Sequence, residues 1–515
     1  MKNVPTTAST VTLSIYGLHS RQLEDWQNDE GFGLEYRWVV LTVTSVAAFM
    51  ANLDARIVIV GLPTIGRQLG IGLTELIWVT QAYVFMITIF SLLLGRVTDI
   101  VGRLKLFKIG FAIFTIGSAL SALSFTGAEL IISRAVQGVG GAMIIGNSAA
   151  MLTDVAKGND LGTLLGANML VGSIGSFAGL TLSGIILAIT DWRGLFYINV
   201  PIGILGVFWA HKKLHEISLK DPEQNIDWMG FLTFSIGLAL ILLALTFFSY
   251  GLSELNLGAS MMIVGALLIC LFVWIEARTR APLLDLSLFK IRRFAGGNFA
   301  FLLQSTGWLA MTVLSPFYLQ LGLGLSALQT GLDLLPIQAV LLVTTFLGGW
   351  LSDKYGRANT LAAASIVIDA VGMVLMASVA TNANQSQFIA ALAVTAVGAG
   401  LYIGPNTSDV MFSVAAERRG VASGVRATVQ YISNTSSYGF VVLLLTLAIP
   451  YRTLTTLIQS SAAQIDALAQ AQFLEGARLT ILVLAIVNTV ALVPQLLVRS
   501  MQSDQSLGTA NTFFN

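Results

Sequence analysis

The sequence predicts an all-α protein that crosses a lipid bilayer many times, and two observations support this prediction. The chain has 515 residues, of which 55% are hydrophobic and only 11% are charged, whereas about a quarter of the residues in a soluble protein are charged. The apolar residues also form long runs, separated by short polar connections. Because water cannot accommodate this much exposed apolar surface, the solvent around the folded chain is lipid.

The apolar runs set the number of membrane crossings. A helix needs about 20 apolar residues to cross the hydrocarbon core, and its backbone groups must pair internally because lipid offers them no partner. The runs in this sequence predict fourteen spans. They lie near residues 38–65, 76–95, 106–125, 129–153, 164–190, 195–211, 228–249, 259–276, 296–320, 328–351, 360–380, 387–408, 421–449 and 477–498.

Charge in the connections predicts the orientation. Lys and Arg gather in alternate connections, and the nearly uncharged ones between them include 126–128, 250–258, 321–328 and 381–387. Since basic connections stay in the cytoplasm, we expect a multi-pass protein of the cell membrane with both termini cytoplasmic. Residues 1–37 are polar and lack the features of a secretory signal. The single cysteine and three scattered histidines indicate no disulfide and no metal site, so no cofactor is expected.

One short charged pattern occurs twice, as GRVTDIVGR at 95–103 and GWLSDKYGR at 349–357. Its shared residues keep one constant offset: Gly95, Asp99, Gly102 and Arg103 match Gly349, Asp353, Gly356 and Arg357. Internal repeats are typical of secondary transporters. We expect the first glycine of each copy to end its helix and allow close packing. We expect the aspartate to pair with the arginine or a helix N-terminus, which makes the motif a cytoplasmic gate. Ordinary basic hairpins are the alternative.

Charged side chains inside apolar spans are the candidates for coupling, because they are costly there and usually functional. Asp54 and Arg134 fall in the external halves of spans one and four, within reach of each other, and Gln137 follows Arg134 by one turn. Asp54 and Arg56 point to nearly opposite sides of a helix and do not pair. Asp369 lies in the middle of span eleven. We assign these five residues to proton or substrate coupling; an Asp54 that reaches water and an Asp369 without a transport role are the alternatives.

The repeated pattern resembles the cytoplasmic loop motif of the major facilitator superfamily, G-x-x-x-D-x-x-G-R-[KR], with Leu104 at the last position of the first copy. Further stretches resemble its fourteen-span drug:proton antiporter family, and the resemblance covers about 38–500. They are R-x-x-Q-G-x-G at 134–140 and the segments 192–204, 226–230, 282–298 and 318–336. This resemblance implies two six-helix bundles around a cavity that opens to alternate sides. The implied division is an N-terminal tail 1–37, a bundle 38–212, a linker with two additional helices 213–294, a bundle 295–498 and a tail 499–515.

The chain departs from this antiporter family at three places. Arg56 stands where the first-span motif has threonine, which alters the charge available for coupling. Residues 179–184 read GLTLSG where the span-five antiporter motif reads G-P-x-x-G-G, which bears on proton antiport itself. Residues 433–437 read SNTSS where the family has glycines, which makes Asn434 a candidate for a more polar cavity wall.

Spans nine and twelve offer further residues for a cavity. A site for hydrophobic solutes needs aromatic walls with a few polar groups. The candidates of this kind are Gln304, Trp308, Tyr402 and Asn406. Each of them can equally serve helix packing, and the sequence leaves that alternative open.

These features predict a secondary active transporter and not an enzyme. The sequence holds no G-x-x-x-x-G-K-[ST] loop for ATP and no nucleophile–base pattern. We expect proton-coupled export of hydrophobic or amphipathic compounds (multidrug efflux) by alternating access, with Asp54 as the proton-binding group. A facilitator or exporter of one metabolite or lipid without strict proton antiport is the alternative, followed by a sensor that does not transport. The expected partners are a small hydrophobic or amphipathic substrate, protons and the bilayer, with no nucleic acid, and the chain is expected to be a monomer.

Overall fold

The computed structural model describes residues 35–156, 160–216, 226–250, 254–279, 282–415, 418–460 and 466–497. Within these ranges every regular element is a helix. Thirteen segments of this described part are long and apolar enough to cross a membrane. The predicted all-α polytopic membrane fold is confirmed. The predicted terminal tails lie outside the described residues, apart from residues 35–37.

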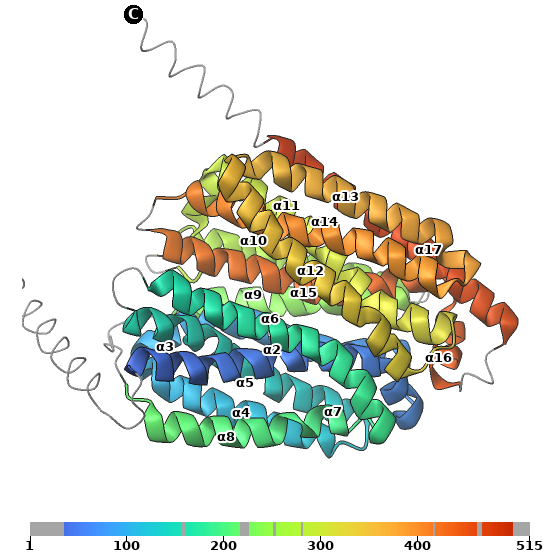
Figure 1. Cartoon of the computed structure of the whole chain (residues 1–515), viewed down its shortest axis with the longest axis horizontal. Coiled ribbons are helices and arrows are strands. Elements are labelled where there is room, and N and C mark those ends of the chain that lie inside the picture. The colour runs from blue at the N-terminus through green and yellow to red at the C-terminus, as the bar shows by residue number, and fades with distance from the viewer. Residues whose placement is uncertain are drawn as a thin grey trace, which may run out of the picture.

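The first half of the chain forms one bundle of helices, drawn blue to green in Figure 1. Its elements are α2 (Tyr36–Leu69), α3 (Leu73–Val101), α4 (Arg103–Ala122), α5 (Gly127–Val155), α6 (Leu161–Ile189), α7 (Gly194–Tyr197) and α8 (Asn199–Lys213). Helix α2 packs along α5 and α6, and α4 packs between α5 and α8. The short α7 and the longer α8 together form the predicted sixth span.

The second half forms the other bundle, drawn yellow to red in Figure 1. Two helices precede it, α9 (Trp228–Ser249) and α10 (Leu255–Glu276), and they pack on each other. The bundle consists of η2 (Leu286–Lys290), α11 (Arg292–Phe317), η3 (Tyr318–Gly322), α12 (Ala327–Tyr355), α13 (Ala358–Val379), η4 (Ala380–Asn382), α14 (Gln385–Phe412), α15 (Arg419–Ala448), α16 (Tyr451–Gln459) and α17 (Ala467–Val490).

Helix α11 fills the place of the ninth predicted span but is less apolar than the thirteen segments noted above. Its side chains are buried without interruption from Gln304 to Phe317. A helix that is surrounded by protein can carry polar side chains, since neighbouring helices supply hydrogen-bond partners that lipid lacks. Position inside the bundle, and not contact with lipid, therefore determines the composition of α11.

The two bundles meet along two pairs of helices, α6 with α12 and α3 with α15, and α9 packs over the second pair. Near the middle, the hydroxyls of Thr88 and Thr435 lie 2.9 Å apart. Toward the end of the molecule that holds α16, the amide of Gln320 donates to the Val60 carbonyl at 2.8 Å and that of Gln459 to the Gly70 carbonyl at 3.0 Å. These contacts close the α16 end, which is opposite the two loop motifs.

The segment before α11 ties both bundles together at the loop-motif end. Arg96 of α3 donates to the Pro282 carbonyl at 3.0 Å, and Arg418 beside α15 donates to the Asp285 carboxylate at 2.5 Å. Partial burial acts to raise the pKa of Asp285, but hydrogen bonds from Ser287 and Arg418 outweigh it and lower that pKa. Asp285 therefore stays ionised, and its ion pair with Arg418 persists, at neutral pH.

Candidate functional site

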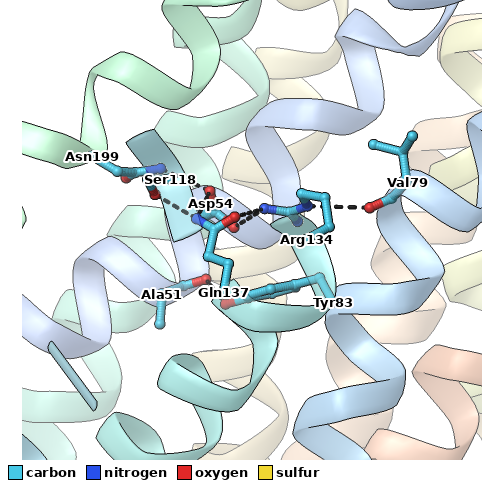
Figure 2. Close-up of polar contacts among 8 residues, drawn as sticks. All are labelled: Ala51, Asp54, Val79, Tyr83, Ser118, Arg134, Gln137 and Asn199. Atoms are coloured by element: carbon cyan, nitrogen blue, oxygen red, sulfur yellow. Dashed lines mark hydrogen bonds and ion pairs between the residues drawn. The ribbon is translucent and has the colours of Figure 1, made fainter. Parts of the chain in front are cut away.

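Asp54 lies at the centre of a hydrogen-bonded network in the first bundle (Figure 2). Its carboxylate is fully buried. One oxygen, Oδ2, accepts from Arg134 Nη1 at 2.6 Å. The other, Oδ1, accepts from Gln137 Nε2 at 2.9 Å and from Asn199 Nδ2 at 2.7 Å. Helices α2, α5 and α8 are thereby joined at one charged group.

Two of the three guanidinium nitrogens of Arg134 donate hydrogen bonds to described residues. Its Nε donates to the Val79 carbonyl at 3.1 Å, and its Nη1 also donates to Gln137 Oε1 at 2.5 Å. The guanidinium lies 4.3 Å from the ring centre of Tyr83, an arrangement that favours a desolvated cation. Only Nη2 has no hydrogen-bond partner among the described residues. Gln137 in turn donates to Ser118 Oγ at 2.6 Å, which brings α4 into the network.

Glycines of α5 let the neighbouring helices reach this point. A Cβ on Gly138 would lie 2.5 Å from the Tyr83 carbonyl oxygen, and one on Gly140 would lie 2.4 Å from the Phe114 nitrogen. Both atoms belong to backbone, which cannot move aside without shifting α3 or α4. The glycines after Gln137 therefore serve close packing, and this packing places the network residues within hydrogen-bond distance of each other.

Arg56 points away from this network into a cavity between the two bundles. The cavity is lined by residues of α2, α3, α5, α11 and α15. Its aromatic residues are Tyr83, Tyr431 and Tyr438, and Asn434 also contributes to the wall. Tyr83 therefore belongs to both places, because it lies under Arg134 and lines the cavity. Asp54 pairs with Arg134, and it forms no ion pair with Arg56 in the described part of the chain.

Of the five cavity candidates from the sequence, only Asn434 lines this cavity. Gln304, Trp308, Tyr402 and Asn406 are buried inside the second bundle. Tyr402 stacks on the ring of Phe301, and Asn406 accepts from Arg426 at 2.8 Å. The polar groups of Gln304 and Asn406 find partners on neighbouring helices. In this conformation these four residues lie outside the lining of the cavity, so their role in substrate binding stays a prediction.

Asp369 is also fully buried, in the middle of α13. It accepts from Gln304 Nε2 at 2.9 Å through Oδ2, whereas Oδ1 has no partner among the described residues. No ion pair to it is found in the described part of the chain. Asp369 thus differs from Asp54 in having no cation beside it, and it lies away from the residues that line the cavity.

In both loop motifs a helix ends at the second glycine of the motif, and not at the first as expected. Gly102 has φ +103° and Gly356 has φ +62°, a backbone conformation that favours glycine. Gly95 and Gly349 lie inside α3 and α12, so the expectation that they end the helices is wrong. A glycine within a helix lowers its stability by only about 1 kcal/mol and does not terminate it. Close packing at this point depends on Gly404 of α14, where a Cβ would lie 2.7 Å from the Gly349 nitrogen, and not on Gly349 itself, where a Cβ would have open space.

The two copies of the motif differ in their contacts. Arg103 donates to the carboxylate of Asp154 and to the Ala150 carbonyl, both at the end of α5. In the second copy Asp353 and Arg357 are exposed and do not pair with each other. The side chain of Asp99 lies outside the described part of the structure. The first copy thus fastens α4 to α5, whereas Asp353 and Arg357 of the second copy form no ion pair with any described residue.

The fold and these motifs agree with a comparison to known protein families. The Major Facilitator Superfamily sequence profile matches residues 44–437 of the chain. The chain belongs to the major facilitator superfamily. It is accordingly a multi-pass membrane transporter and not an enzyme.

Several curated members of the superfamily are similar along most of their length. Riboflavin transporter RibZ of Clostridioides difficile (strain 630) is 31% identical over 400 residues, which cover 78% of this chain and 86% of RibZ. Multidrug transporter protein MdtP of Bacillus subtilis (strain 168) is 27% identical over 391 residues, 75% of this chain and 71% of MdtP. A solved bacterial homolog of the human lysosomal transporter Spinster has a TM-score of 0.67 at 14% identity, and the match covers 90% of this chain and 97% of that one.

The altered span-five segment of this superfamily member lies where three helices meet. Helix α6 continues without a break from Leu161 to Ile189, through Leu180. A Cβ on Gly179 would lie 2.6 Å from the Leu53 carbonyl oxygen of α2, and one on Gly184 would lie 2.7 Å from the Ala327 carbonyl oxygen of α12. The glycines that remain in this segment therefore keep α6 close to the Asp54 helix and to the second bundle.

Three residues of the network were not predicted from the sequence. Asn199 lies in the 192–204 segment and donates to Asp54, but only its position as a lone amide among apolar residues distinguishes it. Ser118 and Tyr83 carry no signal in the sequence, because their partners lie on other helices. Their roles follow from the helices that pack beside Arg134 and Gln137.

Proposed function

We propose that this transporter exports hydrophobic or amphipathic compounds in exchange for protons, and that Asp54 is the proton-binding group. The observation that supports this proposal is the fully buried pair of Asp54 and Arg134, which lies one side chain away from the aromatic cavity. A buried carboxylate beside one cation can exist in two protonation states, and each state favours a different helix arrangement. Two relatives, one named a multidrug transporter and one a multidrug resistance protein, support the proposed substrate class.

Coupling follows from what Asp54 holds together. In its ionised form the carboxylate accepts from α5 and α8 at once. A proton on Asp54 removes the charge that attracts Arg134, and the guanidinium then retains the Val79 carbonyl, Gln137 and the Tyr83 ring. Since Tyr83 also lines the cavity, a shift of Arg134 changes the wall that the substrate contacts. Proton binding and substrate binding are linked through this one tyrosine.

Alternating access requires a closed end and an end that opens. In the described residues the direct hydrogen bonds between the two bundles lie at the middle and at the α16 end, whereas at the loop-motif end the bundles are joined through the segment before α11, by Arg96 to Pro282 and Arg418 to Asp285. If the basic loop motifs face the cytoplasm, the closed end is external and the cavity is offered to the cytoplasm. An exporter takes up its substrate in this state, and the loop motifs then close the cytoplasmic face.

The test is transport by the Asp54→Asn variant in proteoliposomes. We expect gradient-driven accumulation of substrate to be lost, because asparagine cannot bind and release a proton, whereas substrate binding and exchange without a gradient persist. Asp333→Asn is the matched control, since Asp333 is half-buried on α12 and contacts Gln385 away from the network. If the Asp54→Asn variant concentrates substrate with unchanged pH dependence, Asp54 is not the coupling site and Asp369 becomes the next candidate.

A second candidate function is transport of one metabolite without strict proton antiport. The relative named a riboflavin transporter, at 31% identity, favours this alternative. Susceptibility of cells to a panel of unrelated toxic compounds, with and without a protonophore, separates the two. Protection against several compounds that disappears with the protonophore supports multidrug export, whereas no protection combined with saturable riboflavin uptake into vesicles supports the alternative.

A further inference from the structure

The central cavity contains one charge, that of Arg56, which no other described residue balances. Among the described residues that line it, Arg56 is the only charged one, and the others are tyrosines, small polar residues and aliphatic residues. Arg56 makes no hydrogen bond or ion pair within the described part of the chain, and its side chain is partly exposed to the cavity. The cavity therefore presents a free guanidinium to whatever enters it.

Asp54, two residues earlier on the same helix, does not neutralise this charge. Its oxygens are already occupied by Arg134, Gln137 and Asn199, and residues two apart on a helix point to nearly opposite sides. Asp54 and Arg134 balance each other, so the net charge of the cavity region is that of Arg56. An unpaired cation within a membrane protein is costly, and a ligand that supplies a negative charge removes this cost.

We infer that the cavity takes amphipathic organic anions, whose carboxylate, sulfonate or phosphate group binds Arg56. This inference rests on the proposed role of the cavity as the substrate site. The planar guanidinium suits such groups because it donates two parallel hydrogen bonds. Asn434 accepts from Gln430 through its oxygen and keeps its NH₂ group for a ligand. Tyr431 and Tyr438 supply the aromatic wall for the apolar body.

The base of the Arg56 side chain is confined by the neighbouring helix. A Cβ on Gly179 of α6 would lie 3.1 Å from the Arg56 Cβ, so the two helices are in close contact at this point. This contact restricts the first atoms of the side chain and leaves the guanidinium end to the cavity. Less conformational entropy is lost when a ligand binds a side chain that is already restricted.

The test compares three dyes that share one aromatic body and differ in charge: pyrenebutanoate, pyrenebutanol and pyrenebutylammonium. Binding is measured by fluorescence to the full-length protein in nanodiscs of zwitterionic lipid, with empty nanodiscs subtracted. We expect the carboxylate dye to bind at least about tenfold more tightly than the alcohol, and Arg56→Gln to weaken its binding by about tenfold to a hundredfold without changing the alcohol. Arg67→Gln, which removes an exposed cation from the end of the same helix, is the control and keeps the preference.

Any one of four results overturns the inference. The three dyes bind with equal affinity, the carboxylate dye does not bind, Arg56→Gln binds it as tightly as the wild type, or Arg67→Gln weakens its binding as much as Arg56→Gln does. If Arg56→Gln also loses the alcohol dye, Arg56→Lys decides: retained preference for the anion supports the inference and lost preference overturns it. The assay needs no proton gradient, so its result does not depend on whether Asp54 couples transport to protons. Anion binding without proton-driven transport therefore refutes only the proposed coupling, and proton-driven transport without anion preference refutes only this inference.

Discussion

Replacing Arg134 by methionine tests whether the Asp54 network depends on its cation. Methionine has a similar length and fills most of the space, so packing changes little. The carboxylate of Asp54 then keeps the hydrogen bonds from Gln137 and Asn199 but loses its only ion-pair partner in the described part of the chain. The variant thus leaves a buried charge that no other charge compensates.

The expected cost follows from this geometry. Removing one partner of a buried ion pair costs about 3–5 kcal/mol. The upper part of this range is expected here, because both side chains are fully buried and the variant also loses the contact of Arg134 with the Tyr83 ring, 4.3 Å away. The double variant Asp54→Asn/Arg134→Met carries no uncompensated charge. Its loss of stability should fall short of the sum of the single losses by at least about 2 kcal/mol.

The assay is reversible unfolding of the purified protein in mixed micelles, with helicity followed by circular dichroism as the denaturing detergent is titrated. Arg478→Met is the control, because Arg478 forms an exposed pair with Glu475 at 3.0 Å, and exposed pairs contribute about 0–1 kcal/mol. An Arg134→Met cost no larger than that of Arg478→Met, or additive losses in the double variant, would show that the pair does not stabilise the bundle as argued.

Three further outcomes are expected. Gly140→Ala should destabilise the protein by about 1–3 kcal/mol, because its Cβ would lie 2.4 Å from the backbone of α4. Gly146→Ala is the control, since a Cβ there has open space around it. Equal melting temperatures of the two variants would contradict the packing argument. Asp99→Asn and Asp353→Asn should each lower turnover in proteoliposomes at normal expression, and wild-type rates in both would refute the gating role. Because Leu180 retains the backbone hydrogen bond that a proline lacks, substrate flux should persist after the proton gradient is collapsed, and complete loss of flux with a protonophore would contradict this.

The sequence alone determined the membrane fold, because its signal is local. Twenty apolar residues in a row must form a helix in lipid wherever they occur, so the spans could be placed without knowing their neighbours. The same holds for Arg134 and Gln137, whose spacing of one turn puts them on one face of α5. It also holds for Asp54 and Arg56, whose spacing of two separates them on α2.

Only the tertiary structure decided which polar side chains meet each other and which meet the cavity. Asn199 and Tyr83 join Asp54 and Arg134 because α8 and α3 pack beside α2 and α5. Gln304 turned toward Asp369 inside its bundle, whereas Asn434 turned toward the cavity, although the two look equally suitable in the sequence. The rotation of a membrane helix about its own axis depends on close packing and hydrogen bonds with its neighbours. Those contacts join residues far apart in the chain. The local apolar pattern that predicts a span therefore cannot predict them.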